Sequence, residues 1–70
     1  MAKWTRKQLD ALTNEQILDV AMKQEDFIDK QRGYYTGITR ERFARLGRET
    51  LIDCIMADQK TFNIPKEQTL

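Results

Sequence analysis

Residues 13–33 read TNEQILDVAMKQEDFIDKQRG, and this stretch decides the fold. Thr13 followed three residues later by Gln16 is a capping-box pattern, because the hydroxyl accepts a backbone N–H and the amide side chain reaches back to the cap. A stripe with a period close to 3.6 residues follows, which is typical of an amphipathic helix. The stripe consists of Ile17, Val20, Ala21, Gln24, Phe27 and Ile28. Gly33 suits the position after a helix end, so a helix is predicted over 14–31.

The same signals recur on both sides of this helix. Thr5 and Gln8 repeat the capping box, with Trp4 before the cap as a hydrophobic staple, and they predict a short helix over 6–11. Residues 33–38 read as a loop, after which Thr39 is expected to cap a second long helix at about 40–61. Gly47 either divides this helix into 40–46 and 48–61 or marks a close helix crossing.

The predicted fold class is therefore all-α, as a small bundle of three to four helices. Helix-forming residues dominate, and the single proline, Pro65, lies near the end of the chain. We expect residues 1–62 to form one helical domain and residues 63–70 to form a flexible C-terminal tail. An alternative is that Phe62 and Ile64 fold back onto the bundle.

Composition argues against catalysis. The 70 residues include no histidine and a single cysteine, Cys54, so the commonest general base and metal ligand are missing. We expect no enzyme activity, no metal, no cofactor and no small-molecule substrate. No apolar run approaches the ~18–20 residues of a membrane helix, and we expect no membrane partner. One unpaired cysteine without a signal peptide favours a cytoplasmic location.

Charge is arranged in blocks although the net charge is only +1. Residues 1–9 carry +3, residues 10–29 carry −5, residues 30–48 carry +5 and residues 49–70 carry −2. A basic block that also contains aromatic residues is a candidate surface for nucleic acid or for an acidic protein partner. The candidate contact residues are Lys30, Arg32, Tyr34, Tyr35, Arg40, Arg42, Arg45 and Arg48.

Each part of this candidate surface has a purely structural alternative. The arginines would pair with the acidic helix 14–31, in which case most of them are not available to a ligand. One ring of Tyr34 and Tyr35 would cover the core while the other stays exposed.

A second apolar face is predicted on the two long helices. Its residues are Leu18, Met22, Ile52 and Met56. Either a homodimer buries this face, or a third helix or residues 61–64 of the same chain cover it.

Two segments carry a resemblance to a known class of modules. Residues 9–21 read LDALTNEQILDVA, and residues 43–55 read FARLGRETLIDCI. The order of features in these segments resembles helix–extension–helix modules. A leucine, a threonine cap and an amphipathic helix come first, and they are followed later by Arg48-Glu49, Leu51-Ile52 and Ile55. These modules are the SAP-type domains and the N-terminal helical domain of transcription terminator Rho. The resemblance covers about 30 of the 70 residues and implies nucleic-acid binding, although the link between the helices is longer here.

Three functions from different classes follow. The leading expectation is a small non-enzymatic module that binds nucleic acid through the arginine-rich segment. The alternative is a small phage- or mobile-element-type protein that binds a host protein and inhibits or regulates it. The third is a homo-oligomeric assembly component. Steep salt dependence indicates the first, copurification with one protein indicates the second, and a stable oligomer indicates the third.

Overall fold

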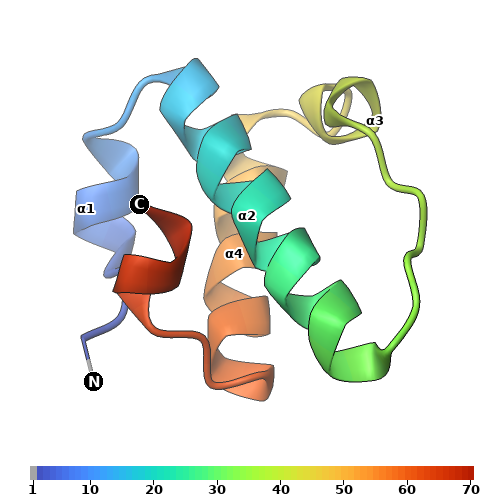
Figure 1. Cartoon of the computed structure of the whole chain (residues 1–70). Helices are drawn as coiled ribbons and strands as arrows, with labels where there is room; N and C mark the ends of the chain where they lie inside the picture. Colours follow the sequence, from blue (N-terminus) through green and yellow to red (C-terminus); the bar gives the residue numbers. More distant parts are fainter. Residues whose placement is uncertain (1) are drawn as a thin grey trace.

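The computed structural model describes residues 2–70, so Met1 of the expected domain 1–62 lies outside the described residues. The fold is all-α, with four α-helices and one 3₁₀ helix among these residues (Figure 1). This confirms the predicted fold class. The elements are α1 (Arg6–Asp10), α2 (Asn14–Arg32), α3 (Arg40–Ala44), α4 (Arg48–Thr61) and the 3₁₀ helix η1 (Lys66–Thr69).

The core lies where α2 and α4 pack on each other, and α1 and the N-terminal segment close one end of it (Figure 1). Burial of these aliphatic side chains is the main favourable contribution to folding. The core cluster consists of Trp4, Leu9, Ile17, Leu18, Val20, Ala21, Leu51, Ile52 and Ile55.

Both predicted capping boxes are present. The hydroxyls of Thr5 and Thr13 accept from the backbone N–H groups of Gln8 and Gln16, each at 3.1 Å, and both glutamine side chains bond back to the caps. A threonine cap contributes about 1 kcal/mol to helix stability. Gly33 ends α2 in the left-handed conformation at φ 84°, a backbone geometry that glycine adopts at little cost.

The expected long helix 40–61 is interrupted, which corrects that prediction. The chain leaves α3 at Arg45 and enters α4 at Arg48, with Gly47 at φ 82° and ψ 161° as the N-cap of α4. This left-handed φ lies outside the helical region, so Gly47 breaks the helix. Of the two alternatives for Gly47, the structure therefore has the break.

The C-terminal segment is part of the bundle, contrary to the expectation of a flexible tail at 63–70. Ile64 is 1% exposed and Pro65 is buried, and η1 packs against α2. The Trp4 indole Nε1–H donates to Thr69 Oγ1 at 2.7 Å, and the Lys66 backbone N–H donates to the Ala2 carbonyl at 2.8 Å. The two ends of the chain are thus joined, and the domain extends to the last residues.

The predicted second apolar face is also not a surface of this fold. Leu18 is 7% exposed and Ile52 is fully buried, while Met22 and Met56 are half-buried. Met56 packs against the core cluster. The chain itself therefore covers most of this face, because α1 and the C-terminal segment contact the helices that carry it.

Candidate binding surface

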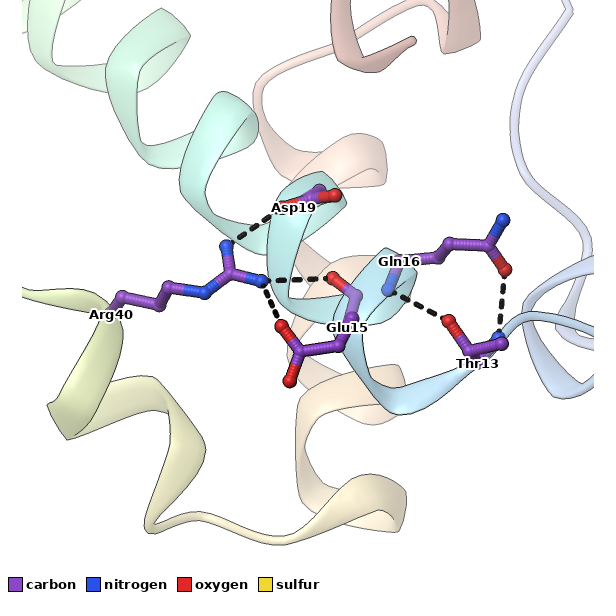
Figure 2. A network of polar contacts seen from close by, with 5 residues as sticks. All are labelled: Thr13, Glu15, Gln16, Asp19 and Arg40. Atoms are coloured by element: carbon purple, nitrogen blue, oxygen red, sulfur yellow. Dashed lines mark hydrogen bonds and ion pairs between the residues drawn. The ribbon is translucent and has the colours of Figure 1, made fainter.

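Arg40 is bonded to carboxylates of its own chain at the surface, although its side chain is about 39% exposed. Its guanidinium donates from Nη1 to Asp19 Oδ1 at 2.7 Å, and from Nη2 to Glu15 Oε2 at 2.8 Å and to the Glu15 carbonyl at 3.2 Å (Figure 2). The hydrogen bonds that Arg40 donates to Glu15 and Asp19 raise its already high pKa. Arg40 therefore joins the start of α3 to the first turns of α2.

Arg48 is committed in a similar way at the start of α4. Its Nη2 donates to the carbonyls of Asp10 at 2.6 Å and Leu12 at 2.8 Å, and its Nη1 donates to Asn14 Oδ1 at 2.8 Å. These carbonyls belong to the turn between α1 and α2. A guanidinium fork can satisfy several acceptors at once, so Arg48 stabilises the turn and is not available to phosphates.

Lys30 and Arg32, near the end of α2, make weaker contacts. Lys30 Nζ lies 3.0 Å from Asp26 Oδ2, four residues earlier, and the hydrogen bond to Asp26 raises the pKa of Lys30. Arg32 lies over the Phe62 ring at 5.6 Å. Because exposed ion pairs contribute little to stability, these two side chains can flank a ligand site but do not define one.

Arg42 and Arg45 differ from the other arginines of the basic segment. Both are exposed, and neither guanidinium has an ion pair or hydrogen bond to any residue between 2 and 70. They are three residues apart, on α3 and its C-cap, a spacing that places side chains on one helix face. Their charge is therefore available to an outside partner.

Tyr34 and Tyr35 are 60% and 72% exposed. Neither ring covers the core, so the alternative in which one of them does is wrong. The connecting segment 33–39 runs along one side of the molecule from the end of α2 to α3 (Figure 1). Thr36 Oγ1 donates to Glu25 Oε1 at 2.9 Å, and Arg40 fixes the far end, so this segment is tied to α2 at two points.

Leu46, which the sequence did not single out, is the remaining large apolar side chain near this edge, at 43% exposed. The signal that could have identified it is its position next to Gly47, because a helix break turns a residue out of the regular apolar stripe. We call the set formed by Tyr34, Tyr35, Arg42, Arg45 and Leu46 the loop–α3 edge.

Two further features lie outside the loop–α3 edge, the thiol of Cys54 and a cleft at the starts of α2 and α4. Burial raises the pKa of the half-buried Cys54 thiol, with Asp58 and Asp53 adding to the effect. This makes the nucleophilic thiolate scarce. A cleft of about 270 Å³ lies between the starts of α2 and α4. The one carboxylate in its lining, Glu15, is paired with Arg40.

Residues 2–70 lack a metal-binding cluster and a membrane-spanning helix. No group of three or more His, Cys, Asp or Glu side chains there is arranged to hold a metal ion. No helix of this part of the chain combines the length and apolar composition required to cross a membrane.

Comparison with known proteins does not assign the chain. No family model matches it, and searches of curated proteins and of solved structures found no match. The resemblance to helix–extension–helix modules therefore stays a prediction.

Proposed function

We propose that this protein is a non-enzymatic module that binds nucleic acid through the loop–α3 edge. The observation that carries the proposal is that Arg42 on α3 and Arg45 at its C-cap have no ion pair among residues 2–70, at one end of a segment that exposes two tyrosines. Arginine forks suit phosphate oxygens, and aromatic rings stack on bases. The edge thus offers both kinds of group that nucleic acid requires.

The proposal uses a smaller contact set than the one predicted from the sequence. Of the six cations in residues 30–48, Arg40 and Arg48 are used within the fold, which leaves Arg42 and Arg45 as the main phosphate contacts. For a single strand, each phosphate contact contributes about −0.7 to the slope of log affinity against log salt concentration. Two contacts therefore predict a slope of about −1.4. Affinity should then fall about sevenfold between ~50 and ~200 mM salt.

A second candidate is a regulator that binds a protein with an acidic surface. The observation that favours it is Leu46, which adds exposed apolar area beside the arginines. Tyrosine and arginine are also the residue types most often found at the centre of protein interfaces. This partner would use the same edge and would not require a nucleic acid.

The test is binding of the purified protein to labelled DNA and RNA oligonucleotides at the two salt concentrations. The variant Arg42→Ala/Arg45→Ala should lose most of the affinity and most of the salt dependence. A matched control is Lys7→Ala/Lys60→Ala, which removes the same charge from exposed positions on α1 and α4. This control should change affinity by about twofold or less, because exposed charges far from a ligand are screened.

The outcomes separate the two candidates. Equal losses in both variants would show that binding follows net charge rather than the edge. No binding of any oligonucleotide at the lower salt would reject nucleic acid as the ligand. A pull-down with the wild-type protein and the Arg42→Ala/Arg45→Ala variant would then test the acidic protein partner.

A further inference from the structure

We infer that the ligand of the loop–α3 edge is single-stranded nucleic acid, with unpaired bases stacked on Tyr34 and Tyr35 and with phosphates held by Arg42 and Arg45. This inference rests on the proposed function and specifies its ligand. Three features of the molecule support it: the exposure of the two rings, the absence of an element that fits a duplex groove, and the charge of the long helices.

The two rings present aromatic faces that only unpaired bases can use. Tyr34 and Tyr35 are adjacent in the chain, lie outside any helix and are more than half exposed. In a duplex, each base is already stacked on its neighbours, whereas in a single strand the base faces are accessible. Stacking on aromatic side chains is a common, sequence-tolerant mode of single-strand binding.

No helix or strand pair at the loop–α3 edge has a shape that fits the groove of a nucleic-acid duplex. The major groove of DNA admits an α-helix or a two-stranded ribbon. The helix at this edge, α3, has only 5 residues, and the chain breaks at Gly47 soon after it. No strand occurs among residues 2–70. A rigid groove-reading element is therefore missing from this side of the molecule.

The two long helices are also less suited to the groove, because each carries more carboxylates than cations. On α2 there are three cations and five carboxylates, and on α4 there are two cations and three carboxylates. A helix inserted in the groove is flanked by phosphates on both sides, which repel such groups. A single strand laid along segment 33–39 avoids both acidic faces, since it contacts only the edge.

The geometry also limits the length of the strand. Segment 33–39 spans at most about 22 Å between its end Cα atoms, since an extended chain advances no more than ~3.6 Å per residue. At ~3.4 Å per stacked nucleotide, about six nucleotides match the length of this segment. An oligonucleotide of about 12 nucleotides, twice that length, also leaves room for contacts with Arg42 and Arg45 beyond the segment.

The test compares one sequence as a single strand and as a duplex, each ~12 nucleotides long and carrying 2-aminopurine, whose fluorescence responds to stacking. Three proteins are used: wild type, Tyr34→Ala/Tyr35→Ala and Tyr34→Phe/Tyr35→Phe. Because both rings are exposed, the alanine variant should keep the wild-type melting temperature. The phenylalanine variant retains the aromatic faces and loses only the hydroxyls.

We expect the single strand to bind at least about tenfold more tightly than the duplex. The alanine variant should bind it at least about fivefold more weakly, the lower limit for loss of one stacked base, and the phenylalanine variant should bind like wild type. Equal or tighter duplex binding, or unchanged affinity in the alanine variant, would overturn this inference. The proposed function would survive either result if Arg42→Ala/Arg45→Ala still weakens binding. Binding of neither ligand would overturn both.

Discussion

Gln59, on α4, holds the N-terminal segment on the bundle through two hydrogen bonds to Trp4, and its replacement by leucine is a sharp test of the fold. The Trp4 backbone N–H donates to Gln59 Oε1 at 3.0 Å, and Gln59 Nε2 donates to the Trp4 carbonyl at 2.6 Å. Gln59 is 4% exposed and Trp4 is 7% exposed. In Gln59→Leu, both backbone groups of Trp4 lose their partner at a site that water barely reaches.

The magnitude follows from these two groups. Each buried polar group left unsatisfied costs about 1–3 kcal/mol, and the added apolar surface of leucine returns about 1–2 kcal/mol. With each group at about 2 kcal/mol and a return of about 1.5 kcal/mol, we expect the free energy of unfolding to fall by about 2.5 kcal/mol. For a domain of this size the total is roughly 4–10 kcal/mol, and the melting temperature should fall by about 10–20 °C.

The assay is urea unfolding followed by far-UV circular dichroism, with Gln31→Leu as the matched control. Gln31 is exposed on α2, so the same substitution there should change the free energy by less than about 0.5 kcal/mol. A Gln59→Leu protein within that margin of wild type would refute the reasoning. It would mean that the bonds to Trp4 do not hold the N-terminal segment on the bundle.

Three further predictions concern single positions. Gly47→Ala should destabilise the protein by about 1–2 kcal/mol in urea unfolding, because φ is 82° there; an unchanged midpoint would contradict the left-handed break. Arg48→Lys should cost about 1 kcal/mol because an ammonium cannot reach all three acceptors, whereas Arg45→Lys should be neutral. Burial, together with repulsion from Glu25, raises the pKa of Asp58, so its ionisation lowers stability as pH rises above about 3.9. Asp58→Asn should therefore raise the melting temperature at about pH 7, and this gain should disappear below about pH 3.9; a gain that is independent of pH would contradict the assignment.

Local signals in the sequence were sufficient to predict the helices at the N-terminal half. Thr5, Thr13 and Gly33 act through bonds to residues within four positions, so their effect is readable without knowledge of the fold. The break at Gly47 was one of two alternatives, because a glycine in a helical pattern is compatible with both until its φ is known.

The ordered C-terminal segment was predicted only as the alternative in which Phe62 and Ile64 fold back onto the bundle, for a different reason. Its burial depends on Trp4, whose indole bonds to Thr69 across 65 positions of the chain. Segment 63–70 contains Pro65 and polar residues, which locally resemble a mobile tail. No pattern within the segment indicates the distant partner.

The candidate site was predicted in part. The charge blocks identified the basic segment, but they do not distinguish Arg40, which pairs with Glu15 and Asp19, from Arg42, which has no partner among residues 2–70. That distinction depends on the direction in which α3 leaves the connecting segment. The prediction that Leu18 and Ile52 lie on an exposed apolar face was wrong, because both are buried. Helical periodicity shows which residues share a face, but it does not show how many neighbouring elements cover that face.

The most direct test of the account is a titration of ¹⁵N-labelled protein with a single-stranded oligonucleotide, followed by two-dimensional NMR. We predict that the changes in amide chemical shift concentrate in residues 33–46, at the loop–α3 edge. The variant Arg42→Ala/Arg45→Ala should show no such changes at the same oligonucleotide concentration. Shifts centred instead on α1 or on the exposed face of α4, or no shifts in the wild-type protein, would contradict the claim that this edge binds nucleic acid.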